Sequence, residues 1–240
     1  MRPKIICHMI TSIDGKLHPE RWTRTANVND KKTLSAYYED KADELHANGW
    51  IVGRTTMSYY AKGHDRTSLI TPLPSEQLRK TYIAERSNRQ FAITIDPKGK
   101  LHYGRENQRN EHRLTILSES VSDEYLTELQ EDNVSYLFAG TDGTDLNLAM
   151  NILYNDFGVT KLLLEGGGII NGTFLQAKLV DEISLLIYPG LDGCAGVQSI
   201  FEYQGEQSNF PTREMHLRLY VAHTLDAGMV WLRYFVDYQN

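Results

Sequence analysis

Three consecutive glycines, Gly166 to Gly168, carry the clearest chemical signal in the sequence. They follow a short apolar run and Glu165, and they precede apolar residues at helical spacing. A glycine loop between a strand and a helix lets a ligand approach backbone N–H groups with no Cβ in the way. The helix N-terminus adds N–H donors and a positive dipole end, which favour an anion. The segment predicts a phosphate or pyrophosphate cradle, although a tight turn would use the same glycines.

A second strand-to-helix junction lies at Gly53, directly after the apolar residues 50–52. Arg54, Thr55 and Thr56 follow it. The threonine hydroxyls are suited to capping the next helix. They are equally suited to binding a phosphate, with Arg54 supplying a charged fork. Two such junctions favour nucleotide binding, because each would bring N–H donors to the same sheet edge.

The loop after the first apolar run offers a carboxylate and an aromatic ring. Asp14 precedes Gly15, a pair typical of turns, but a carboxylate at the carboxyl end of a strand is also placed to face a ligand. Trp22 lies between Arg21 and Arg24. The indole either anchors the loop or stacks on a planar ligand ring, with the arginines near phosphates.

Alternating strands and helices would position these residues, because that order is typical of a mostly parallel sheet with right-handed crossovers. A helix is predicted to begin at an N-cap in Asn29-Asp30 and to end near Gly49. Two long C-terminal strands around Asp226-Ala227-Gly228 predict an antiparallel hairpin. The other predicted strands are residues 4–11, 50–53, 91–95, 114–117, 134–139, 162–164 and 181–190, and the other predicted helices are 57–61, 75–85, 122–131, 146–157 and 169–175.

Composition bounds the class of protein. The chain has 240 residues, 41% of them apolar and 23% charged, which is typical of a globular protein with a sizeable core. The net charge of −6 argues against nucleic acid and acidic membranes as partners. Neither a signal peptide nor a membrane-spanning run is predicted, and the two cysteines lack zinc-type spacing, so we expect a cytoplasmic protein without a metal site. Residues 1–240 are predicted to form a single domain.

Several motifs, taken in their order, resemble the riboflavin-biosynthesis reductase family. That family is similar to the C-terminal domain of the bifunctional deaminase–reductase. The resemblance covers nearly the whole chain, and its most specific part is 164–182. It implies an α/β, three-layer fold like that of dihydrofolate reductase, a mostly parallel twisted sheet with an antiparallel C-terminal hairpin, NADPH as cofactor and a homodimer. The matching motifs are 11–17, 22–23, 52–56, 164–168 and 179–182.

The resemblance also implies roles for individual residues. The adenosine side of NADPH would lie along Gly53, Arg54, Thr55 and Thr56, and the pyrophosphate along Gly166, Gly167, Gly168 and Ile169. Thr11 and Trp22 would contact the cofactor, whereas Asp14 and Glu165 would face the substrate. No deaminase zinc motif is present, so only the reductase half is implied.

Two positions depart from the family pattern. His8 stands where the pyrimidine reductases usually carry a lysine, and Glu44 stands roughly where they carry an arginine. Those cations help to hold a phosphorylated ribose, and a carboxylate in place of a cation repels a phosphate. The sequence therefore predicts the cofactor site more firmly than the substrate.

The implied reaction is hydride transfer from NADPH to a carbonyl- or imine-like carbon of a pyrimidine such as 5-amino-6-(5-phosphoribosylamino)uracil. Asp14 would stabilise a cationic imine or relay a proton. Glu165 would hydrogen-bond the pyrimidine edge, and Arg54 would contact the 2′-phosphate of NADPH. Two alternatives remain open: a dihydrofolate-reductase-like enzyme, and a non-catalytic nucleotide-binding protein that kept the cradle and lost the substrate site.

Overall fold

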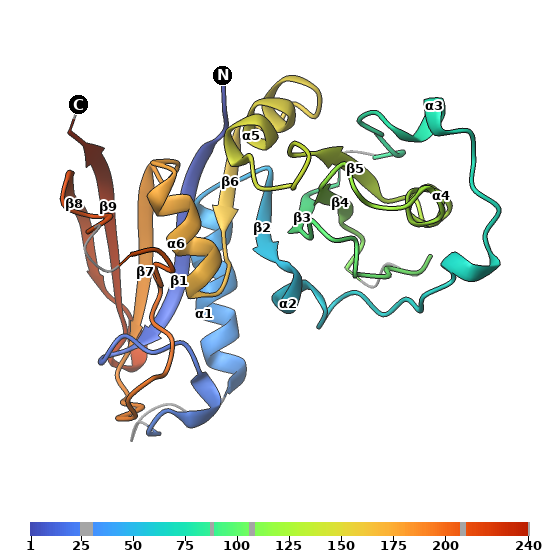
Figure 1. Ribbon diagram of the computed structural model, residues 1–240. Helices are drawn as coiled ribbons and strands as arrows, with labels where there is room; N and C mark the ends of the chain where they lie inside the picture. The colour runs from blue at the N-terminus through green and yellow to red at the C-terminus, as the bar shows by residue number, and fades with distance from the viewer. Residues whose placement is uncertain (25–30, 87–88, 106–108, 207–209, 240) are drawn as a thin grey trace. The chain divides into compact units, whose positions relative to one another are not determined.

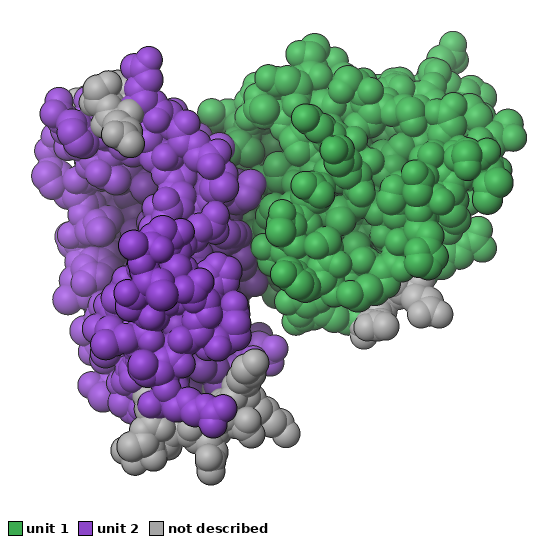
Figure 2. Space-filling model, turned by 60° about the horizontal axis from the view of Figure 1, so that its bottom comes forward, with its two compact units in different colours: residues 1–3, 48–160 green, residues 4–47, 161–240 purple. Residues whose placement is uncertain are grey.

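The computed structural model describes residues 1–24, 31–86, 89–105, 109–206 and 210–239. The chain forms two compact units, which Figure 2 colours separately. Unit 1 comprises residues 1–3 and 48–160, and unit 2 comprises residues 4–47 and 161–240. Because the chain leaves unit 2 after residue 47 and returns to it at residue 161, residues 4–47 and 161–240 fold together.

Unit 1 is built on four parallel strands in the order β5-β4-β3-β2. Helix α2 contacts β2 and β3, and α4 and α5 both contact β5. The strands are β2 (Gly49–Gly53), β3 (Phe91–Ile95), β4 (His112–Leu117) and β5 (Ser135–Phe138), and the helices are α2 (Arg54–Met57), α3 (Ser75–Leu78), α4 (Asp123–Glu131) and α5 (Leu146–Asn155).

Unit 2 is built on five strands in the order β6-β1-β7-β9-β8. The central strand β1 is parallel to both β6 and β7, whereas β7–β9 and β9–β8 are antiparallel. Figure 1 shows helices α1 and α6 on opposite faces of this sheet. The strands are β1 (Lys4–Ser12), β6 (Lys161–Leu164), β7 (Glu182–Tyr188), β8 (Met215–Thr224) and β9 (Val230–Tyr238), and the helices are α1 (Lys31–Glu44) and α6 (Gly168–Gln176).

Short apolar runs and helix caps explain these elements. Strands β2 and β3 are buried at every position, as expected for parallel strands covered on both faces. Ser122 begins α4 because its hydroxyl accepts a hydrogen bond from the N–H of Tyr125. Asp145 begins α5 in the same way, through the N–H of Leu148.

The predicted fold class is confirmed: parallel strands flanked by helices are followed by an antiparallel hairpin. Three helices differ from their predicted extents by more than two residues. Helix α1 ends at Glu44 and not near Gly49. Helix α2 begins directly at Arg54 because Gly53 serves as its extended N-cap, and α3 ends at Leu78. The predicted N-cap Asn29-Asp30 lies outside the described residues. The single domain 1–240 stays a prediction. Of the helices described, none is both long enough and apolar enough to span a bilayer.

Candidate functional site

The glycine loop of unit 2 ends in an uncapped helix. Gly167 is the N-cap of α6 and makes no side-chain cap bond. Among the described residues, no acceptor bonds the backbone N–H groups of Gly167, Gly168 or Ile169. A helix leaves its first N–H groups without partners inside the helix, so these donors are available to an anion. Beside them Ile169 presents an exposed apolar side chain.

The three glycines have different surroundings. A Cβ on Gly167 would have only Gln198 Oε1 nearby, at 3.7 Å. A Cβ on Gly168 would lie 2.4 Å from the carbonyl oxygen of Ser199 and 2.6 Å from Glu202 Cγ. The N–H of Glu202 donates to the carbonyl oxygen of Gly168 at 2.8 Å. Gly168 is therefore needed for packing against residues 199–202, whereas Gly167 leaves the loop open to a ligand.

Asp14 is held as an anion beside the loop that follows β7. Its Oδ1 accepts from the Ser12 hydroxyl at 2.6 Å and from the N–H of Asp192 at 3.1 Å. Its Oδ2 accepts from the N–H of Gly193 at 2.9 Å. These bonds, the one from Ser12 above all, lower the pKa of Asp14 to about 2. Asp14 thus has the properties of a fixed negative charge rather than of a proton donor near neutral pH.

Trp22 and Thr11 lie inside unit 2. The Trp22 ring stacks on Tyr188 at 5.3 Å between centroids and is buried. Within the described part of the chain its buried Nε1 has no hydrogen-bond partner. Thr11 is buried near the carboxyl end of β1, opposite Ile187. Trp22 therefore anchors its loop, and its contact with a cofactor stays a prediction.

Strand register sets the depth of the two predicted substrate carboxylates. Strand β6 ends at Leu164, which pairs with Cys7 of β1, and Glu165 follows it. Burial, and then the charge of Glu165, raises the pKa of the Cys7 thiol. Asp14 follows the end of β1 at Ser12. Ser12 is five positions beyond Cys7, which corresponds to about 16 Å along the strand at its usual rise per residue. The two carboxylates thus lie at different depths along β1.

His8 is part of the core of unit 2. Its Nε2 donates to the carbonyl oxygen of Tyr38 at 3.1 Å, and its Nδ1 accepts from the hydroxyl of Ser184 at 3.0 Å. Burial lowers the pKa of His8 to about 4, so the ring is neutral at neutral pH. Glu44, at the end of α1, pairs with Lys41. Neither position supplies the cation found in the family pattern.

The second junction lies in unit 1. Gly53 closes β2, and α2 receives no side-chain cap, so the hydroxyls of Thr55 and Thr56 do not serve as its N-cap. Arg54 and Thr55 are exposed. The guanidinium of Arg54 acts electrostatically on Asp96, which follows β3. The junction therefore presents a cation and two hydroxyls at the carboxyl edge of the unit 1 sheet.

Sequence reasoning missed two polar residues at that same edge. Asp96 is buried and accepts from the N–H groups of Lys100 at 2.6 Å and Leu101 at 2.8 Å. Burial nevertheless raises its pKa. Ser118 follows β4 and is also buried. Both stand directly after an apolar strand, which is the signal that would have identified them, since carboxyl ends of parallel strands share one edge.

Unit 1 also contains a pocket of about 210 Å³ with several basic side chains. It lies toward the amino ends of the strands, because Tyr60 contacts the ring of Trp50 and the guanidinium of Arg113 donates to the carbonyl oxygen of Gly104. The pocket is therefore separate from the edge that carries Arg54. Its lining residues are Tyr60, Lys62, Gly63, His64, Arg66, Tyr103, Gly104 and Arg105.

The strand order within each unit and the glycine loop before α6 place the chain in the dihydrofolate-reductase-like α/β class. The profile of one family, described as the RibD C-terminal domain, matches residues 3–231. The chain belongs to this family.

Named relatives agree with this assignment. The 2,5-diamino-6-ribosylamino-4(3H)-pyrimidinone 5′-phosphate reductase of Aquifex aeolicus is 26% identical over 231 residues, covering 91% of this chain and 90% of that protein. The reductase of the same name from Methanothermobacter thermautotrophicus is 32% identical over 98 residues, and that match spans 40% of this chain and only 44% of the relative. A pyrimidine reductase-like protein of Corynebacterium diphtheriae has a similar fold, with a TM-score of 0.64, 19% identity and coverage of 98% and 92%.

Proposed function

We propose that this protein is an NADPH-dependent reductase of riboflavin biosynthesis. The observation that carries the proposal is the uncapped N-terminus of α6, where three N–H groups follow an open glycine loop. Backbone donors and the helix dipole together suit the pyrophosphate of a dinucleotide. Two relatives that bear the name of a pyrimidinone phosphate reductase support the assignment of reductase chemistry.

The residues present fit such a cofactor. Gly167 has open space at its Cβ position, so a phosphate oxygen can approach its N–H and that of Ile169. Thr11 and Trp22 would contact the cofactor from unit 2. When bound, NADPH supplies the hydride that reduces the substrate. The residues of the chain would bind and orient the two molecules.

In unit 1 the second junction would hold the adenosine side of the cofactor. Gly53 opens the turn, and Thr55 and Thr56 offer hydroxyls that do not cap α2. Arg54 is exposed and suited to the 2′-phosphate, which distinguishes NADPH from NADH.

The substrate we propose is a phosphorylated ribosylaminopyrimidine. The names of the relatives favour 2,5-diamino-6-ribosylamino-4(3H)-pyrimidinone 5′-phosphate over 5-amino-6-(5-phosphoribosylamino)uracil. Glu165 would accept hydrogen bonds from the pyrimidine edge, and the fixed anion Asp14 would stabilise positive charge on an imine. An elongated substrate suits two carboxylates that lie at different depths along β1.

One observation favours a second candidate. His8 is neutral and Glu44 is anionic where the family pattern has cations. A nucleotide-binding protein without turnover would tolerate both changes. A dihydrofolate-reductase-like enzyme is the third reading, because the fold is shared.

Absorbance assays of NADPH oxidation test these readings. Turnover of the diaminopyrimidinone phosphate supports the proposal, and turnover of the uracil compound alone would correct the substrate. Reduction of dihydrofolate would favour the third reading. NADPH binding without turnover of any of the three would favour the non-catalytic protein, and absence of NADPH binding would overturn all of them.

We further propose that the protein acts as a cytoplasmic homodimer without nucleic-acid or membrane partners. Strand β8 supports the dimer, since it is the last strand of the unit 2 sheet and exposes Leu217, Leu219 and Tyr220. An exposed edge strand with apolar side chains is a template for association. Sedimentation should give twice the mass of the chain, and Leu219→Lys should shift it to monomer.

A further inference from the structure

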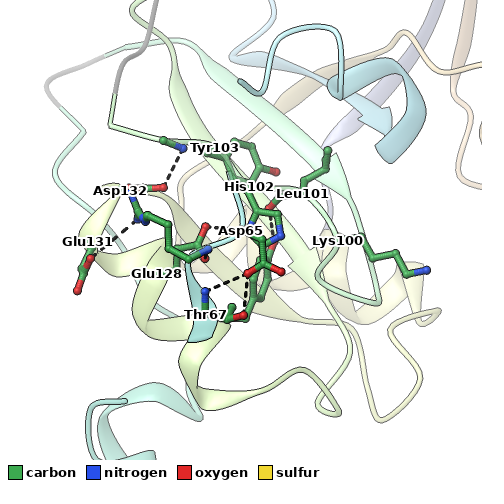
Figure 3. Close-up of polar contacts among 12 residues, drawn as sticks. Asp65, Thr67, Lys100, Leu101, His102, Tyr103, Glu128, Glu131 and Asp132 are labelled. Atoms are coloured by element: carbon green, nitrogen blue, oxygen red, sulfur yellow. Dashed lines mark hydrogen bonds and ion pairs between the residues drawn. The ribbon is translucent and has the colours of Figure 1, made fainter. Parts of the chain in front are cut away.

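Three side chains of metal-binding type converge in unit 1, away from the proposed cofactor residues. Asp65 comes from the segment after α2, His102 from the loop after β3, and Glu128 from α4. One ligand atom of each lies within 4.8 Å of the other two. Figure 3 shows the three side chains pointing toward one another. The sequence predicted no metal site, because residues so far apart match no ligand spacing.

Glu128 is the strongest indication that this cluster is built for a ligand. Its side chain is only 1% exposed. Burying a carboxylate is costly unless it is paired or binds a metal. Its Oε1 lies 2.8 Å from His102 Nδ1, and its Oε2 accepts the N–H of Arg66 at a weak 3.3 Å. The buried carboxylate therefore has one close partner, which is itself a metal-ligand type.

Asp65 is already oriented as a ligand. Its Oδ1 accepts from both the N–H and the hydroxyl of Thr67, at 3.0 and 2.7 Å. Over the described ranges of the chain its Oδ2 accepts no hydrogen bond, so this oxygen remains available. Ligand atoms of a tetrahedral zinc site are about 3.4 Å apart, given bonds of about 2.0–2.2 Å. The three atoms reach that spacing with small side-chain shifts.

The local charges suit a divalent cation. Asp65 and Glu128 bring two carboxylates, whose charge balances a dication, and His102 adds an imidazole nitrogen as a donor. The cation next in sequence, Arg66, is bound to Asp132 at 2.8 Å. The charge of Arg66 is thereby largely offset by its own partner.

We propose that Asp65, His102 and Glu128 form a zinc-type site, with a fourth position open to water. Zn²⁺ binds imidazole nitrogen as well as carboxylate oxygen, whereas Mg²⁺ and Ca²⁺ prefer oxygen alone. The ligands alternate in sequence with residues that line the basic pocket: His64 and Arg66 flank Asp65, and Tyr103 follows His102. A bound ion would link the two pocket-lining segments, those around Asp65 and His102, to Glu128 of α4.

Equilibrium dialysis of the full chain against Zn²⁺ tests the site. Cys194 is an exposed thiol that can bind zinc itself, so every protein carries Cys194→Ser. We expect one equivalent of zinc, and at least about tenfold weaker binding in Asp65→Asn and in His102→Ala. Replacement by Co²⁺ should give the visible absorption of a four-coordinate ion, and excess Mg²⁺ should not displace it.

The chain provides matched controls. Asp142 accepts the N–H and hydroxyl of Thr144 at 3.0 and 2.8 Å, as Asp65 does with Thr67, but lies outside the cluster. Asp142→Asn and His64→Ala should bind zinc as the parent does. Circular dichroism verifies that each variant is folded. The test replaces the exposed Asp65 and not the buried Glu128, because loss of a buried carboxylate is the change that would unfold the protein. Absence of zinc binding by the parent, a loss below tenfold in both cluster variants, or equal loss in the controls would overturn the site.

Discussion

The Nδ1 atom of His8 lies 3.0 Å from the hydroxyl oxygen of Ser184. That hydroxyl also accepts the indole N–H of Trp231 at 2.9 Å, so its own proton points to the histidine. The carbonyl oxygen of Tyr38 in turn receives the Nε2–H. This chain of bonds fixes one neutral tautomer of the imidazole, and burial of the ring lowers its pKa to about 4.

Stability should therefore fall in mild acid. The pKa of His8 is about 4 in the folded state and 6.5 in the unfolded chain, so the unfolded state binds more protons between these values. The stabilisation is complete above pH 6.5 and is lost as pH falls toward 4. At about 1.4 kcal/mol per unit, the loss is about 3 kcal/mol. Urea unfolding at a series of pH values measures it.

His8→Asn isolates this contribution, because His112 has its pKa lowered to about 4 as well and remains in the variant. The variant should lose less free energy of unfolding between pH 7 and pH 4.5 than the parent. Identical slopes in the two proteins would contradict the neutral assignment of His8.

Gly167 and Gly168 should respond in opposite ways to alanine. Gly168→Ala places a methyl group against the Ser199 carbonyl oxygen and should cost about 1–3 kcal/mol of unfolding free energy. Gly167→Ala meets open space in an extended backbone conformation and should change stability by less than about 0.5 kcal/mol. Its methyl group would stand where the phosphate approaches, so NADPH affinity should fall about tenfold.

Urea unfolding and fluorescence titration with NADPH separate the two effects. Unchanged NADPH affinity in a folded Gly167→Ala protein would show that the glycine loop is not part of the cofactor site. Unchanged stability of Gly168→Ala would contradict the close packing of residues 199–202.

Strand positions could be predicted from the sequence because parallel strands buried on both faces are short apolar runs. Residues 91–95 show this directly, being predicted and observed with the same bounds. The glycine loop was likewise predictable, since it lies between such a run and a helical pattern. Most of the fold was therefore predictable from local patterns in the sequence.

Features that depend on distant segments could not be predicted. The need for glycine at position 168 arises from Ser199, some thirty residues later, and the different depths of Asp14 and Glu165 arise from strand register. His8 lies within an apolar strand, but its neutral state depends on Ser184 and Tyr38, which fold against it from other elements.

Arg54 should determine cofactor preference without affecting the fold. Its side chain is exposed at the carboxyl edge of unit 1, so Arg54→Ala should leave stability nearly unchanged. Loss of a charged hydrogen bond to the 2′-phosphate should weaken NADPH binding about tenfold and leave NADH binding unaltered. Fluorescence titrations with both cofactors measure the ratio. Arg105 is another exposed arginine of unit 1, and the control variant Arg105→Ala should keep the preference for NADPH. Equal losses of affinity for both cofactors in Arg54→Ala would exclude the proposed role of Arg54.

Asp14 should contribute through its charge and not through proton transfer. With a pKa of about 2 it remains ionised over the whole working range, so it adds no ionisation to the pH profile of kcat/KM above pH 4. Asp14→Asn should lower kcat about 100-fold, as expected for removing a group that stabilises transition-state charge, and leave the profile's shape unchanged.

Ser12→Ala separates this role from anchoring of the neighbouring loop. It removes the hydroxyl that donates to Asp14 at 2.6 Å but keeps the carboxylate. Because that hydrogen bond is the largest cause of the lowered pKa, the pKa of Asp14 should rise toward its ordinary value, still well below neutral pH. Activity near neutral pH should then stay within a few-fold of the parent. A loss in Ser12→Ala as large as that in Asp14→Asn would assign Asp14 to holding the loop at Asp192 and Gly193, and an acid limb that moves in Asp14→Asn would assign it to proton transfer.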